Sequence, residues 1–411
     1  MKYKIWYSTE SFADYIIDNT ILNGKNISKS KMYESDANNS ANFHTLPDHI
    51  KKILYLDAPD IIVEFNSEPI FSIEVSTEAG TGHNAFQRFA RLAASVENNV
   101  PAFYIYPEAA IITRKDSLPK WDKINPLIFK ALNDVMSIYK IPAVLYYFPS
   151  DYRLFPNDAS SSPNLMNKGL KFDTRIDYAG SPEGTDGEMI SMFNSINEII
   201  QSIELDGIIN GREKLLSKRT FIDRCSIMNR EFIEKGGSID SSPITATKKI
   251  PTEYLLNYLS NYEDSNYKIG NLLKSRNETI IYQVDAKFRG DPYPGALAAL
   301  DYLLCREGKT FEDRKYNLIL AWGEVIINNE NKSISINSNK ASIEDFTMAV
   351  KASENKNILN KNYTDLKNSE ISRYYMQVRY GSTFSKVKHI RVYSYFADGI
   401  LFNDGALWRD A

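Results

Sequence analysis

Acidic side chains occur in this sequence at a spacing that can bring them together on adjacent strands. Asp60 opens one apolar run, and Glu74 lies near the end of a second, fourteen positions later. Side chains alternate along a strand, so Glu74 shares a polar face with Ser72 and Ser76, and a turn at residues 66–67 folds Asp60 alongside. Two such carboxylates can hold Mg²⁺, and a water on that ion can attack a phosphate ester.

A second segment places an acid and a lysine on one strand face. Asp285 and Lys287 are two positions apart and share this face with Gln283. A lysine beside a metal ligand can orient the attacking water and offset charge that develops at phosphorus. Asn271 precedes Asp285 by the same fourteen positions that separate the first two acids. The spacing predicts that one structural unit occurs twice.

Strands and helices must position these residues. Strand-like composition occurs at residues 60–65, 70–75 and 102–106, and helical apolar spacing occurs at residues 85–95. The same order of strand, strand, helix and strand returns before residue 322. This order predicts an α/β protein with helices packed on mixed sheets.

Length and composition set the class of protein. The 411 residues exceed one comfortable hydrophobic core, and a hydrophobic content of 43% with 25% charged residues is typical of globular proteins. Cys225 and Cys305 give neither a disulfide framework nor a zinc spacing. The sequence has no apolar run of membrane-spanning length and no signal segment at its start. These features predict a cytoplasmic protein that does not interact with membranes.

Composition shifts divide the chain into three parts. We expect lobes at residues 1–150 and 246–411, and a loop followed by helices at residues 151–245 as a linker. Lysines and arginines are frequent between Arg212 and Arg230. They form either a contact surface for DNA phosphates or a solvated helix face with interspersed acids.

The first segment resembles the PD-(D/E)xK signature of restriction endonucleases and related nucleases, in which an Asp, a second acid and a Lys two residues later form the site. Asp60 and Glu74 match the two acids, and Gln87 lies where some exonuclease-like members carry a glutamine. Asp285 and Lys287 are similar to the second half of the signature. The resemblance implies two restriction-endonuclease-like lobes, each a mixed sheet flanked by helices, joined by a mainly helical linker.

The resemblance also implies an activity. A member of this family would be a magnesium-dependent endonuclease that hydrolyses phosphodiester bonds of double-stranded DNA, most simply a type II restriction endonuclease. Asp60, Glu74 and Asp285 would hold Mg²⁺, and Gln87 and Lys287 would complete the catalytic residues. Two lobes in one chain could address both DNA strands, a role that a homodimer usually fills, and both assemblies stay open.

Each copy departs from the signature at one position. Ser76 stands where the family has Lys, and Asn271 stands where it has the first Asp. Arg88 could assist the first copy, and Glu278 or Glu253 could supply the carboxylate that the second lacks. The departures favour an alternative function, a nucleic-acid-binding or structural module whose degenerate nuclease lobes do not cut.

A competing interpretation rests on glycines. Gly80, Gly82 and Ala85 follow a strand and open a helix, as in the Gly-x-Gly-x-x-(Gly/Ala) fingerprint of dinucleotide-binding folds. Glu108, at the end of the next strand, would then bind a ribose. However, Glu78 would lie near the pyrophosphate and repel it. The sequence therefore favours the nuclease prediction.

Overall fold

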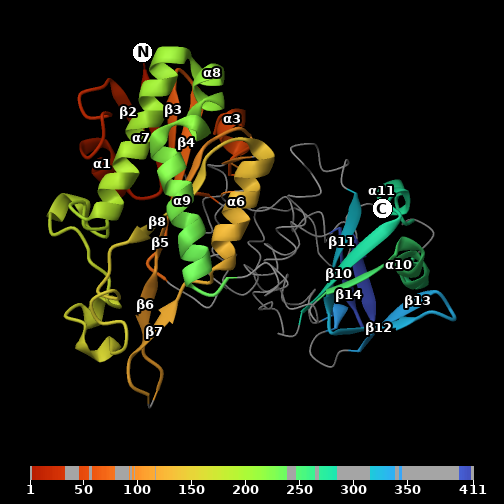
Figure 1. The fold of residues 1–411 in the computed structure, drawn as a ribbon. Helices are drawn as coiled ribbons and strands as arrows, with labels where there is room; N and C mark the ends of the chain where they lie inside the picture. Colours follow the sequence, from red (N-terminus) through yellow and green to blue (C-terminus); the bar gives the residue numbers. More distant parts are fainter. Residues whose placement is uncertain are drawn as a thin grey trace. The chain divides into compact units, whose positions relative to one another are not determined.

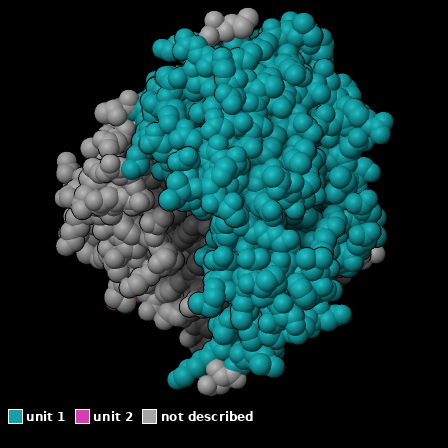
Figure 2. Space-filling view, turned by 90° about the vertical axis from the view of Figure 1, so that its left-hand side faces the viewer, with its two compact units in different colours: residues 1–34, 42–54, 58–237 teal, residues 35–41, 55–57, 238–411 magenta. Residues whose placement is uncertain are grey.

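The apolar runs of the sequence form two separate mixed β-sheets in a computed structural model of the chain (Figure 1). The structure describes residues 2–32, 46–54, 58–78, 92, 95–96, 98–115, 117–237, 247–263, 268–284, 315–337, 342–344 and 398–408. Unit 1 comprises Met1–Glu34, Asn42–Leu54 and Ala58–Gly237, shown in teal in Figure 2, and unit 2 comprises Ser35–Ala41, Tyr55–Asp57 and Ser238–Ala411. The fold is thus α/β, with mixed sheets flanked by helices.

The sheet of unit 1 has six strands in the order β2-β1-β3-β4-β5-β8. Strands β4, β5 and β8 are parallel, whereas β3 is antiparallel to both of its neighbours, β1 and β4. Almost every residue of β3, β4, β5 and β8 is buried, as expected for a sheet covered on both faces. The strands are β1 (Tyr3–Tyr7), β2 (Ile27–Lys31), β3 (Ile61–Phe65), β4 (Glu68–Val75), β5 (Ala102–Pro107) and β8 (Ala143–Phe148).

Two further strands of unit 1 form a hairpin that directly follows β5. They are β6 (Ala109–Ile112) and β7 (Lys120–Lys123). The described helices of the unit are α1 (Glu10–Asp18), α3 (Asp48–Lys51), α6 (Leu127–Tyr139), η2 (Ala159–Ser161), η3 (Leu165–Asn167), η4 (Ile176–Tyr178), α7 (Gly187–Asp206), α8 (Ile208–Glu213), η5 (Leu215–Ser217) and α9 (Arg219–Glu234). No helix in the described part of the chain combines the length and apolar character needed to span a membrane.

Helices α7 and α9 pack on the sheet of unit 1 and do not form a separate linker (Figure 1). Helix α7 buries an apolar stripe that includes Met192 and Ile196. The Tyr146 hydroxyl and Ser195 Oγ lie 2.6 Å apart, and Arg224 of α9 donates a hydrogen bond to the Leu145 carbonyl at 2.6 Å. The helices expected between residues 151 and 245 therefore exist, but their apolar faces place residues 151–237 within the first unit.

The sheet of unit 2 has five strands in the order β15-β14-β11-β10-β9. Strands β10, β11 and β14 are parallel, and β9 and β15 are antiparallel to their neighbours. Its strands and helices are β9 (Thr247–Pro251), α10 (Thr252–Leu259), η8 (Ser260–Tyr262), α11 (Asn271–Ser275), β10 (Glu278–Val284), β11 (Tyr316–Trp322), the hairpin strands β12 (Glu324–Asn328) and β13 (Ser333–Asn337), β14 (Gly399–Phe402) and β15 (Gly405–Trp408).

The two units share an order of strands. In unit 1, β3 pairs antiparallel with β4, which is followed by parallel β5 and β8; in unit 2, β9 pairs antiparallel with β10, which is followed by parallel β11 and β14. A hairpin directly follows the third strand in both, β6–β7 after β5 and β12–β13 after β11. The two units thus share this order of strands.

The ungapped alignment that equated Asn271 with Asp60 is wrong. Asn271 begins the short helix α11. The strand that pairs with β10 is β9, which ends about twenty residues before Asn271. A five-residue segment with two adjacent leucines suits one turn of helix as well as a strand, so its composition did not decide between them.

Candidate functional site

The β3–β4 hairpin brings Asp60 and Glu74 to neighbouring strands. Asn66 and Ser67 form its two-residue turn, with φ values of 51° and 69°, and such left-handed pairs match the twist of a hairpin. Ile61 pairs with Ile73, so the next opposite pair along the antiparallel ladder is Asp60 with Glu74. Directly opposite side chains project from the same face, with Cβ atoms about 4.5–5.5 Å apart. The structure therefore places both acids at one edge of the sheet.

Two hydrogen bonds fix the carboxylate of Asp60. Its Oδ1 accepts one from Ser8 Oγ at 2.9 Å, and its Oδ2 accepts one from the Val75 backbone N–H at 2.8 Å. Asp60 thereby connects the residue after β1 with the end of β4. These two hydrogen bonds hold the ends of the two strands together and orient the carboxylate.

Glu74 lies on β4 and is only 3% exposed. Its partner in the register of the parallel strand β5 is Tyr104. Glu74 and Asp60 differ in environment, because Asp60 is half-buried at the edge. A carboxylate pair of this kind offers the hard oxygen donors that Mg²⁺ prefers.

Ser76 occupies the position at which the PD-(D/E)xK signature has a lysine. The residue is 3% exposed, its N–H donates to the Ile105 carbonyl at 2.9 Å, and its Oγ accepts a hydrogen bond from the Glu78 N–H at 3.2 Å. Ser76 thus stabilises the chain turn after β4 and contributes no positive charge. Of the residues expected to help the first copy, Gln87 and Arg88 lie outside the described residues, as do Gly80, Gly82 and Ala85 of the dinucleotide fingerprint.

Glu108, at the same edge, belongs to a cluster of ion pairs. Its Oε2 lies 2.6 Å from Arg153 Nε and its Oε1 lies 2.5 Å from Lys235 Nζ. Glu231 contacts the same two cations at 3.0 and 3.3 Å and accepts a hydrogen bond from the Tyr147 hydroxyl at 2.9 Å. Both oxygens of Glu108 are thereby held by cations, an arrangement that does not support the role of a ribose ligand.

The electrostatics of this cluster follow from its geometry. Burial alone would raise the pKa of Glu231, but the Tyr147 hydroxyl and the cations Lys235 and Arg153 outweigh it and hold the pKa below its ordinary value. Burial and the adjacent Glu231 carboxylate raise the pKa of Tyr147. Sequence reasoning missed the cluster because only Glu231 and Lys235 show a local signal, their spacing of four on a helix end.

The cations between Arg212 and Arg230 are held within unit 1. Arg224 is buried and pairs with Glu188 at 2.9 Å, and Arg212 donates a hydrogen bond to the Pro69 carbonyl. The other ion pairs are Lys214–Asp206 at 3.1 Å, Lys218–Glu198 at 3.3 Å, Arg219–Asp223 at 2.8 Å and Arg230–Glu234 at 3.8 Å. Of the two interpretations, this arrangement favours the helix face with interspersed acids.

In unit 2, Asp285 and Lys287 lie outside the described residues. Glu278 begins β10, at the opposite end of the strand from Val284, which precedes Asp285 in the sequence, so the two ends are roughly 20 Å apart. Glu278 pairs with Lys249 at 3.0 Å. Glu278 therefore cannot complete a site beyond the end of β10.

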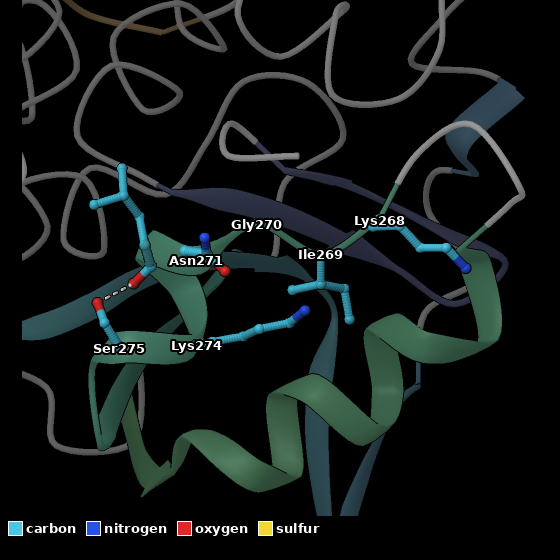
Figure 3. Close-up of a pocket in the computed structure, with 7 residues that line it drawn as sticks. Lys268, Ile269, Gly270, Asn271, Lys274 and Ser275 are labelled. Carbon is cyan, nitrogen blue, oxygen red and sulfur yellow. Dashed lines mark hydrogen bonds between the residues drawn. The ribbon is translucent and has the colours of Figure 1, made fainter.

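Glu253 and Asn271 are also placed away from the end of β10. Glu253 lies in the first turn of α10 and pairs with Lys332 at 3.3 Å. Asn271 lines a pocket of about 610 Å³ beside α11, where the side chain of Lys274 extends toward Ile269 (Figure 3). Since α11 has only five residues, its N-terminus lacks the dipole of a longer helix.

A buried polar network lies where β10, β11 and β14 begin. Arg276 Nη1 is 3.3 Å from Asp398 Oδ2, and both side chains are nearly inaccessible, with exposed fractions of 4% and 3%. Asp398 also accepts a hydrogen bond from the Leu318 N–H at 2.9 Å. Asn317 connects Arg276 to two threonines, since its Nδ2 lies 3.3 Å from Thr252 Oγ1 and 3.2 Å from Thr279 Oγ1. These contacts connect the side chains of Arg276, Asp398, Asn317 and the two threonines in one buried network.

No group of three or more His, Cys, Asp or Glu side chains suited to a metal ion occurs among the described residues. The pair Asp60 and Glu74 is smaller than such a group, and magnesium often takes only one or two carboxylates with water and phosphate oxygens. No protein-family model matches the chain, and neither a curated protein nor a solved structure matches it. The carboxylate pair and the sheet that holds it are therefore the features from which a function can be inferred.

Proposed function

We propose that unit 1 binds a divalent cation between Asp60 and Glu74 and hydrolyses phosphodiester bonds of duplex DNA, as a type II restriction endonuclease does. One observation carries the proposal: Asp60 directly precedes β3, and its carboxylate accepts a hydrogen bond from Val75, the residue after Glu74, on a hairpin whose second strand runs parallel to β5. A hairpin and a parallel strand in one sheet agree with the mixed sheet that the resemblance to PD-(D/E)xK nucleases implies. The fold alone would not suffice, because one fold serves many functions.

The residues of this chain would divide the work as follows. Asp60 and Glu74 would hold Mg²⁺, which when bound supplies an activated water and offsets charge on the phosphate. Ser8 and the Val75 N–H orient the Asp60 carboxylate, so it needs little reorganisation to accept the ion. Gln87, Asp285 and Lys287 stay predictions as further catalytic residues.

A non-cutting module that binds nucleic acid is the second candidate. Ser76 favours it, because a buried serine cannot supply the positive charge that a lysine gives at this position. The two hydrogen bonds of Asp60 favour it as well, since they give this carboxylate a structural role that needs no metal.

Cleavage of plasmid DNA in Mg²⁺ or Mn²⁺ separates the two candidates. We expect Asp60→Asn and Glu74→Gln each to lower the cleavage rate by at least about 10²-fold, since metal catalysis contributes several kcal/mol. Glu78→Gln is the matched control, because it removes one negative charge from an exposed residue four positions after Glu74.

Each outcome of this experiment favours one of the two candidate functions. Unchanged cleavage by both variants would show that the metal site is not between Asp60 and Glu74. If the unmodified protein leaves plasmid DNA intact with both metal ions, the non-cutting module is the better description.

A further inference from the structure

The β6–β7 hairpin extends from the edge that carries Asp60 and Glu74. Strand β5 runs parallel to β4, with Ile105 paired to Val75, and β6 begins just after Glu108. The hairpin is the lowest part of unit 1 in Figure 1, and the same end of the unit protrudes in Figure 2. A ligand at this edge would therefore lie beside the hairpin.

The hairpin is held firmly on the loop that follows β8. Trp121 Nε1 donates a hydrogen bond to the Phe155 carbonyl at 2.8 Å, and the Ile111 N–H donates to the Lys168 carbonyl at 2.8 Å. The Trp121 ring packs edge-on against Tyr152 at 5.4 Å. Gly169 permits this packing, because a Cβ on it would lie 2.4 Å from the Trp121 ring. The hairpin thus presents its outer side chains from a fixed support.

The hairpin carries a net positive charge, because residues 109–123 contain four cations and two acids, Asp116 and Asp122. The four cations are exposed on this support. They are Arg114, Lys115, Lys120 and Lys123, and none forms an ion pair with a residue that the structure describes. Lys123 only approaches the ring of Tyr152, at 5.4 Å. By contrast, Lys214, Lys218, Arg219 and Arg230 of the α8–α9 region each have an acidic partner.

The second hairpin of the chain shows that the architecture does not require such cations. Hairpin β12–β13 occupies the same place in the order of strands, yet its charged residues are Glu324, Glu330 and one lysine, Lys332. Lys332 pairs with Glu253. Residues 109–123 of the first hairpin therefore have a net charge of +2, whereas residues 324–337 of the second have a net charge of −1.

We propose that the β6–β7 hairpin binds the phosphate backbone of duplex DNA that lies at the edge of the unit 1 sheet. Exposed lysines and arginines on a fixed element neutralise phosphates and release counterions, and they position DNA without reading its sequence. Ile105 pairs with Val75 beside Glu74, and Ile112 ends β6. The chain between them spans at most roughly 23 Å, so one turn of B-DNA, about 34 Å long, can reach both the acids and the hairpin. The choice of DNA as the polyanion rests on the proposed function. The positive charge of the hairpin and its fixed support are observed independently of that function.

Binding without any divalent ion tests this inference independently of cleavage. The probe is a fluorescein-labelled duplex of about 25 base pairs in EDTA, followed by anisotropy between 50 and 200 mM KCl. The test variant replaces the four hairpin cations: Arg114→Gln, Lys115→Gln, Lys120→Gln and Lys123→Gln. The matched control makes the same change of net charge on the α8–α9 region: Lys214→Gln, Lys218→Gln, Arg219→Gln and Arg230→Gln.

We expect the hairpin variant to bind on the order of 10²-fold more weakly at low salt, with a salt slope lowered by about 3–4, since each phosphate contact contributes about 0.9. The control should keep both values near those of the unmodified protein. Equal losses in the two variants, or no binding of the duplex by the unmodified protein, would overturn the inference. Tighter binding of single-stranded RNA would overturn duplex DNA as the partner. Hairpin-dependent binding without cleavage would support this inference while the nuclease proposal fails.

Discussion

The two sheets of this protein repeat one arrangement of strands, but the polar clusters described above lie at opposite ends of those strands. In unit 1, Asp60, Glu74 and Glu108 lie where β4 and β5 end. In unit 2, Arg276 and Asp398 lie where β10, β11 and β14 begin. Repeated topology therefore does not carry repeated chemistry, as is general for folds that host several functions.

The polar clusters also differ in their access to solvent. The Arg276–Asp398 pair is almost completely buried, whereas Arg153 of the unit 1 cluster is 62% exposed on its side chain. A buried pair depends on both partners, because removal of one leaves an uncompensated charge. A partly exposed cluster can be rehydrated when one member is lost. The comparison thus predicts unequal costs of substitution.

The largest effect is expected for Asp398→Ala. The substitution leaves the Arg276 guanidinium buried without its carboxylate, at a cost of about 3–5 kcal/mol in the free energy of unfolding. Urea titration followed by hydrogen exchange of β10 and β11 measures the stability of unit 2 separately from unit 1.

An exposed pair and a double variant serve as controls for this measurement. Glu278→Ala breaks the Lys249–Glu278 pair, whose side chains are about half exposed, and should cost no more than about 1 kcal/mol. Arg276→Met combined with Asp398→Leu should recover part of the loss, since it removes the buried charge but leaves the Leu318 N–H without its acceptor. Similar costs for Asp398→Ala and Glu278→Ala would refute the contrast between the two sites.

A smaller and pH-dependent effect is expected for Glu231→Gln in unit 1. The pKa of Glu231 is lowered in the folded protein, so the ionised cluster stabilises the fold above the unfolded pKa of about 4.3 and loses this contribution as the pH falls through the folded value. At pH 7 the variant should lose about 1–3 kcal/mol, and its difference from the unmodified protein should shrink as the medium becomes more acidic.

Thermal unfolding of both proteins between pH 3 and pH 7 measures that difference. Glu234→Gln, on an exposed side chain one helical turn further along α9, is the matched control and should change stability little at any pH. A Glu231→Gln effect that stays constant with pH would show that the carboxylate charge does not stabilise the cluster.

The sequence predicted the β3–β4 hairpin because its signals are local. The Asn66–Ser67 turn and the alternation around Glu74 lie within fifteen residues, and each is a direct consequence of backbone geometry. The same reasoning failed for Asn271, because the pairing of β9 with β10 joins segments about thirty residues apart. Local periodicity cannot show which distant strand completes a sheet.

Long-range polar contacts were beyond the sequence for a related reason. Glu108 and Lys235 meet at 2.5 Å although they are 127 positions apart. Helices α7 and α9 were expected from their apolar spacing, but their packing on β8 depends on where the sheet lies. Near α9, the pairs Arg219–Asp223 and Arg230–Glu234 show a local spacing of four in the sequence. The pair Lys218–Glu198 joins two helices and shows no such signal.

The smallest predicted effects compare the attachments of the two hairpins. Trp121→Phe removes the hydrogen bond to Phe155 O that anchors β6–β7, and Asn257→Ala removes the hydrogen bond at 2.7 Å from α10 to Lys332 O that anchors β12–β13. Each should lower the local stability of its own hairpin by about 0.5–1.5 kcal/mol, measured by hydrogen exchange, and leave the other unchanged. Only Trp121→Phe should also weaken duplex binding, by less than about tenfold, because a looser support must be ordered before its cations meet phosphates. Equal DNA affinity for both variants would mean that the support of β6–β7 need not be rigid, and that its charge alone determines binding.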